Sequence, residues 1–420
     1  MNAKSHYEKG LSHYLLNTPK KNIDLAIKHF EQAAEQGYAD AHYFLGRFYG
    51  LGDGVSLDFH QAIEHYQKGI QLGSHKCGYA LGMLYYTGTG VEKDSDLASD
   101  YFKQNYQVLL MEAEKNDPVS IHILGTYYYY GFNVQRYIFK AIEWFLKSSD
   151  LGYSDSQYML GMIYETIGED ENQKQTAIKY YKLAAAQDHP YAQYALGIIE
   201  LENNNFHKAE QYLEAAAYQH YGLAAYTLAK IYDERDPKHP QKAFEWFMVA
   251  AKQEHVEACY YVGLYYQNGK GVKQDIKQAV IWFEKAALKK DKDALYHLAM
   301  ILMRQPEKDY ETIAKLLEQA AAQDHPNAQY NLAVMYQRGD GVLQSNQKAL
   351  FWYEKAAARN LAIAQYNLGM IYFEGKLVEK DELKAKELWQ KAADQGLEAA
   401  VKLMYSINNY EKLQKSDWQS

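Results

Sequence analysis

The chain has 420 residues, 48% of them hydrophobic, with a formal net charge of −8 and an isoelectric point near 6.0. This composition excludes a disordered chain, and an acidic balance without a basic patch argues against nucleic-acid binding. The apolar runs are only a handful of residues long, far short of the roughly 20 that a membrane helix needs, so we predict no membrane insertion.

The N-terminal residues are polar, and residues 1–9 contain no apolar core of a secretion signal. If residue 1 is the native start, the sequence predicts a cytoplasmic protein. A trimmed periplasmic or secreted form would carry the same residues, so that alternative stays open.

A pattern A-x-Y-x-L-G-x-x-Y recurs along the chain, with clear copies beginning at Ala41, Ser156, Ala192, Ala328 and Ala364. Its central small residue, called the pivot below, recurs every 32 to 43 residues and is always glycine or alanine: Gly46, Gly82, Gly125, Gly161, Gly197, Ala229, Gly263, Ala299, Ala333 and Gly369. A glycine inside a helix costs about 1 kcal/mol relative to alanine. Pivots of this kind therefore predict a close helix–helix approach that a larger side chain would block.

A second pattern, A-x-x-[WY]-[FY]-x-x-A-A, follows each copy of the first, most clearly from Ala243, Ala279 and Ala349. Spacings of three, four and seven place its aromatic and alanine residues on one helical face. Turns such as Gly52-Asp53-Gly54-Val55 stand between the two patterns, and a glycine there supplies a left-handed helix end. The sequence thus predicts about eleven helix-turn-helix repeats.

Three segments depart from the repeat. One step of 43 residues predicts a helix lengthened by about two turns around Tyr101 to Asn116. Next comes the run of four tyrosines at 127–130, of which at least one or two rings should face outward because only one helix face can be buried. The alternative is that the longer helix covers these rings. The turns near residues 166–170, 202–205 and 234–237 lack the paired glycines, which predicts a different curvature in the middle of the array.

A final helix is predicted near Glu398 to Asn408, and Lys402 and the later charges are typical of a solvated capping helix.

Together these patterns resemble the Sel1-like repeat family, a relative of the tetratricopeptide repeat. The resemblance covers nearly the whole chain and implies an all-α, right-handed α-solenoid with a concave, helix-lined face. It also implies a scaffold for protein partners. We predict a solenoid over residues 5–398 and a capping helix with a polar tail over residues 399–420.

The third residue of the first pattern is a tyrosine in nearly every repeat. In the related tetratricopeptide repeat this position lies near the concave side, so these rings and hydroxyls can meet a bound peptide. The alternative is that they pack between neighbouring helices as framework. Positions that vary among repeats, after the pivot and after the last tyrosine, are better suited to specificity. The candidate partner-binding residues are Tyr86, Tyr127, Tyr129, Tyr130, Tyr158, Tyr194, Tyr226, Arg47 and Lys230.

The sequence contains no motif for catalysis or for a cofactor. The G-x-G turns lack the Lys-Ser/Thr of a phosphate-binding loop, and there is no H-E-x-x-H and no cysteine pair at zinc spacing. Cys77 and Cys259 are expected to be buried and free, too far apart for a disulfide. We therefore predict no metal, no cofactor and no catalytic residue.

The leading hypothesis is a non-catalytic scaffold or adaptor in a bacterial cytoplasm that binds a protein or peptide on its concave face. The second, by family analogy, is an immunity-type inhibitor that neutralises a secreted toxin. The third, less favoured, is an enzyme acting on cell-wall or β-lactam-like substrates. Because an open array has two ends, the prediction for assembly is a monomer or a weak homodimer.

Overall fold

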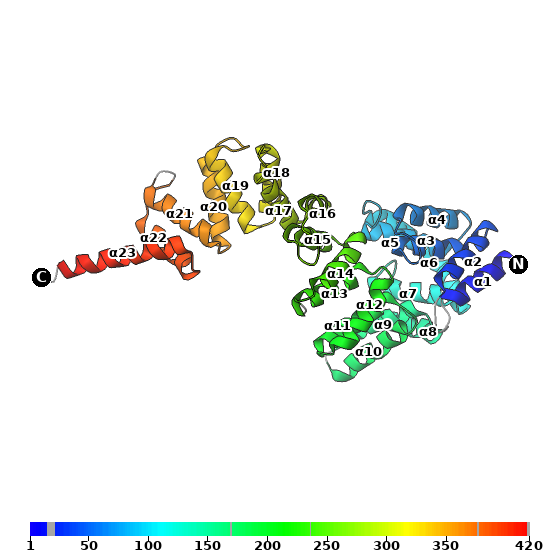
Figure 1. Cartoon of the computed structure of the whole chain (residues 1–420). Coiled ribbons are helices and arrows are strands. Elements are labelled where there is room, and N and C mark those ends of the chain that lie inside the picture. Colours follow the sequence, from blue (N-terminus) through cyan, green and yellow to red (C-terminus); the bar gives the residue numbers. More distant parts are fainter. Residues whose placement is uncertain (15–21, 169, 236, 376–377, 418–420) are drawn as a thin grey trace. The chain divides into compact units, whose positions relative to one another are not determined.

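A computed structural model describes residues 1–14, 22–168, 170–235, 237–375 and 378–417. Within these ranges the chain forms 23 helices and no strand (Figure 1). The predicted all-α solenoid is confirmed. Odd-numbered helices carry the first pattern and even-numbered helices carry the second, so that eleven helix pairs are followed by one additional helix.

The helices group into two compact units, Met1–Leu228 and Ala229–Ser420. The helices of the first unit are α1 (Ala3–Tyr14), α2 (Ile23–Glu35), α3 (Ala41–Leu51), α4 (Phe59–Gln71), α5 (His75–Thr87), α6 (Ser95–Glu114), α7 (Pro118–Tyr130), α8 (Ile138–Asp150), α9 (Ser154–Ile167), α10 (Glu171–Ala185), α11 (Pro190–Glu202) and α12 (Phe206–Tyr218). The boundary falls within α13 (Gly222–Arg235). The helices of the second unit are α14 (Pro240–Lys252), α15 (Val256–Asn268), α16 (Ile276–Leu288), α17 (Lys292–Met303), α18 (Tyr310–Ala322), α19 (Pro326–Arg338), α20 (Asn346–Ala358), α21 (Ala362–Glu374), α22 (Glu382–Asp394) and α23 (Glu398–Asp417).

The pivot residues lie where the two helices of a pair touch. A Cβ atom added at Gly46 would lie 2.3 Å from the Tyr66 ring, and one added at Gly125 would lie 2.5 Å from the Phe145 ring. Both distances are far shorter than a carbon–carbon contact allows. The prediction of a close helix–helix approach is confirmed, with the aromatic residue of the second helix filling the space above the pivot.

The turns follow the predicted capping chemistry. Gly52 ends α3 with φ of 69°, and the Asp58 side chain accepts a hydrogen bond from the backbone N–H of Gln61 at 3.0 Å to begin α4. Where the sequence reads Asp-His-Pro, the histidine is the cap: Nδ1 of His325 accepts from the backbone N–H of Ala328 at 3.1 Å. In the glycine-poor middle, Asn204 takes the left-handed conformation instead, with φ of 60°.

The 43-residue step between two pivots corresponds to an unusually long second helix. Helix α6 has 20 residues, whereas α4 and α8 have 13 each, so the predicted lengthening is confirmed. Its last turn brings Glu112 to the buried Lys76 at the start of α5, with 3.0 Å between the carboxylate and Nζ. Asp40 and Asp117 lie 2.5 Å and 3.5 Å from the same ammonium group. The added turns thus complete a buried charge cluster that joins three consecutive repeats.

Helix α23 packs against α22 and extends past the predicted end at Asn408. Counting 36 residues from Gly369, Tyr405 occupies the pivot position, and it is exposed. A ring at this position would keep a following second helix from approaching as closely as the glycine and alanine pivots allow. The capping role predicted for α23 stays a prediction.

Candidate functional site: a tyrosine-lined pocket in the first unit

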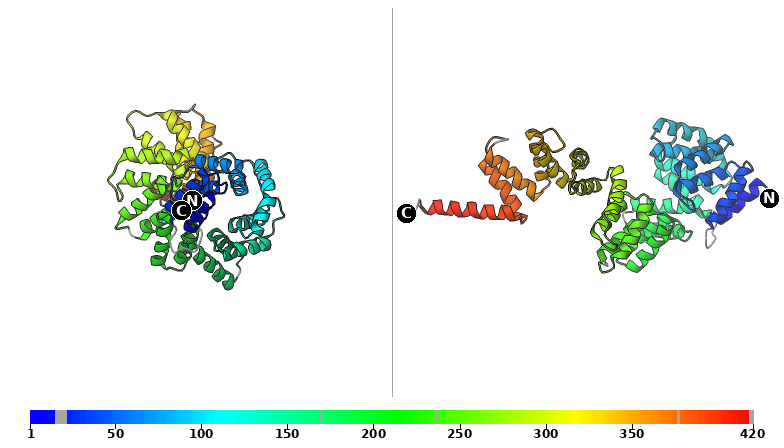
Figure 2. Two further views of the ribbon diagram at one scale, coloured as in Figure 1. Left: turned by 90° about the vertical axis from the view of Figure 1, so that its right-hand side faces the viewer. Right: turned by 45° about the horizontal axis from the view of Figure 1, so that its top comes forward.

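A pocket of about 440 Å³ lies in the first unit. Tyr43, Tyr79, His122 and Tyr158 form part of its wall, and all four hold the third position of the first pattern, in α3, α5, α7 and α9. Because these residues share one repeat position, they line one continuous surface of the first helices. That surface is the one predicted to be concave, and the blue-to-green helices in Figure 2 follow a curved path within this unit.

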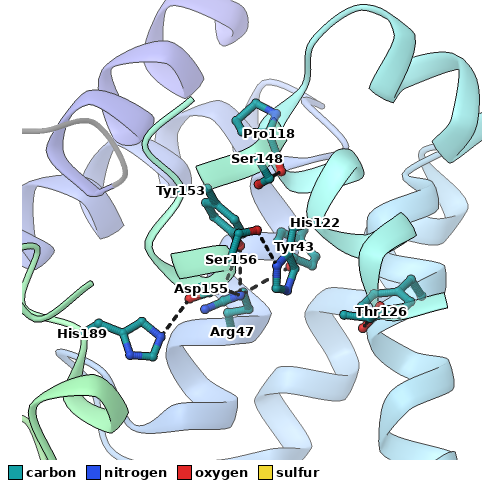
Figure 3. Close-up of polar contacts among 11 residues, drawn as sticks. Tyr43, Arg47, Pro118, His122, Thr126, Ser148, Tyr153, Asp155, Ser156 and His189 are labelled. Carbon is teal, nitrogen blue, oxygen red and sulfur yellow. Dashed lines mark hydrogen bonds and ion pairs between the residues drawn. The ribbon is translucent and has the colours of Figure 1, made fainter. Parts of the chain in front are cut away.

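A charged contact crosses this surface. The Nη1 atom of Arg47 on α3 donates to Oδ2 of Asp155 on α9 at 2.5 Å and to the Tyr153 hydroxyl at 3.2 Å (Figure 3). The Tyr153 hydroxyl itself donates to the same carboxylate oxygen at 2.8 Å. Arg47 and Asp155 are 108 residues apart, in the second and the fifth helix pair. The contact therefore links α3 to α9 across the two complete helix pairs α5–α6 and α7–α8.

A histidine holds the other carboxylate oxygen. Nδ1 of His189 accepts a hydrogen bond from the backbone N–H of Ala192 at 3.3 Å, so the ring proton is on Nε2. That Nε2 lies 3.3 Å from Oδ1 of Asp155. His189 therefore caps α11 through Nδ1 and donates to the buried aspartate through Nε2.

The surroundings of Asp155 and His122 determine the charge state of each side chain. Burial alone would raise the pKa of the Asp155 carboxyl, but Arg47 and the nearby histidines hold that pKa well below its usual range. Burial lowers the pKa of His122 to about 4, so this ring is neutral near pH 7. Its Nδ1 lies 2.9 Å from the Ser156 hydroxyl. The base of the pocket thus holds the ion pair of Arg47 and Asp155 beside the neutral ring of His122.

An exposed aromatic cluster lies close to the pocket wall. Tyr130 stacks on Phe132 with ring centroids 5.2 Å apart, and Tyr86 meets Phe132 edge-on at 4.9 Å. Tyr86 and Tyr130 are 37% and 42% exposed. Tyr129 meets Tyr130 edge-on at 4.9 Å. The Phe102 ring joins this cluster to the pocket, because its centroid lies 4.0 Å from that of Phe132 and 6.0 Å from that of the pocket residue Tyr79. The prediction that some rings of the tyrosine run face outward is confirmed.

Tyr127 differs from its neighbours in the run. It is completely buried, and its hydroxyl donates to the backbone carbonyl of Phe102 at 2.9 Å. A buried ring has no surface for a partner, so we remove Tyr127 from the candidate set. The sequence held the signal: the position two residues after the pivot is apolar or aromatic in the other repeats, as at Phe48 and Ile163, which are also buried.

The remaining candidates divide between the pocket and other places. Arg47 and Tyr158 line the pocket, and Tyr194 meets the pocket residue Tyr221 at 5.2 Å. Tyr226 is half-buried on α13. Lys230 belongs to the second unit, where its Nζ lies 5.0 Å from the Tyr261 ring and 3.3 Å from Glu234. No contact with a partner is tested for any of them.

Sequence reasoning missed Asp155, His189, Tyr191 and Tyr221, which also line the pocket. Each lies in the first turn of a first helix or just before it. Residues in these places were interpreted from the sequence only as helix caps. Arg47 was the available signal, because a lone cation on an otherwise neutral tyrosine surface needs a carboxylate partner.

Among the described residues, no group of three or more His, Cys, Asp or Glu side chains is placed so that it could hold a metal ion, and no helix is long and apolar enough to cross a membrane. Cys77 and Cys259 are buried and free, as predicted. Burial raises the pKa of the Cys77 thiol to about 12, so it is not a reactive thiolate.

The Sel1 repeat model matches the chain eleven times, at residues 5–38, 39–74, 78–104, 118–153, 154–189, 190–221, 222–255, 256–291, 292–325, 326–361 and 362–397. The chain belongs to the Sel1-repeat family. Its predicted membership is confirmed, and the unmatched residues 105–117 are the extension of α6 with the turn that follows it. Sel1-repeat proteins serve as protein-interaction scaffolds and adaptors.

Among curated relatives of this Sel1-repeat chain, the chitin synthase regulator SKT5 of Saccharomyces cerevisiae is 28% identical over 275 residues, covering 52% of this chain and 40% of that protein. The ERAD-associated E3 ubiquitin-protein ligase component HRD3B of Arabidopsis thaliana is 31% identical over 107 residues, covering 25% of this chain and 17% of that protein. The chain thus spans less than half the length of these relatives.

One solved structure matches almost the full length. It is a protective antigen of uropathogenic Escherichia coli strains with an SLR fold, 28% identical, with a TM-score of 0.63, covering 99% of this chain and 90% of that chain.

Proposed function

We propose that this Sel1-repeat protein is a non-catalytic scaffold that binds a segment of a partner protein in the tyrosine-lined pocket of its first unit. The observation that carries the proposal is the pocket itself. One repeat position of four successive first helices forms part of its wall, and the contact between Arg47 and Asp155 joins the helices on its two sides. Its volume lies within the range of roughly 300 to 1,000 Å³ that is usual for binding sites.

The chemistry of the pocket favours binding over catalysis. Asp155 accepts hydrogen bonds from Arg47, Tyr153 and His189 and is held in its ionised form. A carboxylate occupied in this way is poorly suited to take up or release a proton at neutral pH. The names of the two curated relatives, a regulator and a ligase component, also support a role beside an enzyme.

A substitution at Gly50 tests the proposal. Gly50 lines the pocket from the last turn of α3, and an added Cβ would meet only the Cβ of Ala62, at an ordinary 3.6 Å. Gly50→Phe should therefore fill the pocket without disturbing the fold, whereas Gly50→Ala should leave it open. A partner captured by the wild-type chain and by Gly50→Ala, but lost with Gly50→Phe, would support the proposal.

Equal capture by all three proteins would contradict this assignment of the pocket. Circular dichroism and the melting temperature of each variant check that the fold is intact. A toxin among the captured proteins would select the immunity-type hypothesis, which is a special case of the same binding role.

A further inference from the structure

Two pairs of histidines occupy equivalent places in the first two helix pairs. His6 on α1 faces His29 on α2, and His42 on α3 faces His65 on α4. The two Nδ1 atoms are 3.2 Å apart in the first pair of histidines and 3.0 Å apart in the second. In the later helix pairs the residue four before the pivot is never histidine, and the matching residue of the second helix is aromatic or leucine. The repeat fold therefore does not require histidine at these positions.

The pair of His42 and His65 lines a cavity of about 510 Å³ that shares no residue with the tyrosine-lined pocket. His42 is buried and His65 is half-buried. The His65 ring stacks on Tyr49, with ring centroids 5.6 Å apart. Burial lowers the pKa of His42, and burial together with His42 lowers that of His65 to about 4, so both rings are neutral near pH 7. Two neutral imidazoles, the form that binds metal ions, thus stand side by side beside open space.

Charged side chains of both signs surround this pair. Glu31 and Glu35 line the cavity from α2, and Lys68 lines it from α4. The Lys68 ammonium lies 2.7 Å from the Glu64 carboxylate, which reduces its repulsion of another cation. Among the described residues, no third His, Cys, Asp or Glu joins the pair in a metal-binding group. An ion held here would therefore have two protein ligands and keep water in its other positions.

The separation of the two nitrogens indicates which ion fits. An imidazole nitrogen lies roughly 2.0 to 2.1 Å from a bound transition-metal ion, as in zinc sites. With Nδ1 atoms 3.0 Å apart, the angle at such an ion is about 95°. This is close to the right angle of the square-planar or tetragonal coordination that Cu(II) and Ni(II) prefer, whereas the tetrahedral angle of zinc sites needs a separation of about 3.3 Å. Affinity among the divalent ions also peaks at Cu(II).

We infer that His42 and His65 bind one Cu(II) ion through their Nδ1 atoms, with water in the remaining positions. By the same geometry His6 and His29 form a second site of this kind. In the ion-free pair one ring donates its Nδ1–H to the other ring. When an ion binds, the donating ring takes the tautomer with its proton on Nε2, so both Nδ1 lone pairs face the ion. No sequence motif marks such a site, because its two ligands lie on different helices, 23 residues apart.

Isothermal titration calorimetry of the full-length chain with Cu(II), in a buffer that does not bind the ion, tests the inference. We expect the wild type to bind two ions, His42→Gln to bind one, and His6→Gln/His42→Gln to bind none. Glutamine occupies the same repeat position at Gln157 and Gln329, so the fold accommodates it. His60→Gln, which replaces an exposed histidine of α4 outside the pair, should bind two ions like the wild type. The electron paramagnetic resonance spectrum of the copper-loaded wild type should show tetragonal Cu(II) with two nitrogen ligands.

A stoichiometry that does not follow these histidines would overturn the inference. If His6→Gln/His42→Gln still binds two ions, the copper is held by adventitious sites elsewhere on the surface. No binding by the wild type, a spectrum without nitrogen ligands, or tighter binding of Zn(II) than of Cu(II) would also overturn it. A single ion that is lost with His42→Gln would support the site at His42 and His65 and contradict the one at His6 and His29. Circular dichroism checks that each variant keeps its helix content.

Discussion

The two units are built from the same repeat, yet their polar contacts reach different distances along the chain. In the first unit, Arg47 contacts Asp155 across 108 residues. In the second, the Tyr336 hydroxyl donates to Glu318 of the preceding helix at 2.8 Å, and Asn367 donates to Tyr330 of the neighbouring repeat at 3.0 Å. The comparison shows that contacts between neighbours are enough to stack these repeats. The pocket, however, needs a contact across several of them.

Three irregular features of the chain also fall in the first unit. The lengthened helix α6, the buried Lys76 and the exposed tyrosines all lie within residues 1–228. If the two units differ in stability, a small number of side chains in the first unit should therefore account for the difference. The following substitutions test this, from the largest expected effect to the smallest.

Lys76→Met should have the largest effect. It would leave the carboxylates of Asp40, Glu112 and Asp117 in a partly buried cluster without their cation. Removing one partner of a buried ion pair costs about 3 to 5 kcal/mol. Hydrogen exchange measured by mass spectrometry should show faster exchange in the first unit and unchanged exchange in the second.

Adding Glu112→Gln to Lys76→Met should recover part of the loss, because one uncompensated charge is removed. No recovery would show that the cluster acts through packing instead of charge. Burial alone would lower the pKa of Lys76, but Tyr7 and the three carboxyls raise it well above its usual value, so the cluster is intact across the neutral range.

Arg47→Met should have the next largest effect, about 3 kcal/mol, because it leaves the buried Asp155 without its cation. The matched substitution in the second unit is Tyr336→Phe, which removes one hydrogen bond and should cost about 1 kcal/mol. Urea denaturation of both variants checks the difference. Equal destabilisation would show that the long-range contact contributes no more than a contact between adjacent helices.

Lowering the pH should weaken the first unit. Burial lowers the pKa of His122 to about 4, and burial together with His42 lowers that of His65 to about 4. The unfolded chain, with a histidine pKa near 6.5, therefore takes up protons first. Stability is complete above about pH 6.5 and falls between pH 6.5 and 4, by at most about 1.4 kcal/mol per pH unit for each histidine.

Melting temperatures measured across this pH range check the prediction. His122→Gln should reduce the dependence of melting temperature on pH for the first unit and leave that of the second unit unchanged. If His122→Gln does not change this pH dependence, other titratable groups control the loss of stability in acid.

Tyr137→Asp should have the smallest effect, and it should be stabilising. Tyr137 precedes α8 without a capping hydrogen bond, at the position where Asp58 and Asp94 cap the preceding second helices. Its ring is 56% exposed. An aspartate cap contributes about 1 kcal/mol, so the melting temperature should rise by a few degrees. A fall would show that the Tyr137 ring contributes more through packing than a cap would.

The repeat could be predicted from the sequence because the contacts that define it join residues that are close together in the chain. Each pivot glycine and the large side chain that it contacts lie within one helix pair, as with Gly46 and Tyr66, and the spacing of the patterns reveals both. The lengthened α6 was also visible as a longer step between pivots. Features set by neighbours in the chain could therefore be predicted.

The pocket could be predicted only in part. Arg47 and Tyr158, which were predicted from their repeat positions to contact a partner, do line the pocket, and their contact with a partner stays a prediction. That Arg47 meets Asp155 depends on curvature, which is the sum of small rotations from one repeat to the next. No local pattern contains that sum, so Asp155 and His189 could not be paired with Arg47 from the sequence.

The contact between Arg47 and Asp155 also has a consequence for how the chain folds. An array held only by neighbouring repeats can begin folding anywhere and grow one repeat at a time. Arg47 can reach Asp155 only after the helices from α3 to α9 are in place. Contacts between residues far apart in sequence slow folding, because the chain must close a long loop before they form. The first unit should therefore fold more slowly than the second, and the helices from α3 to α9 should form and unfold together.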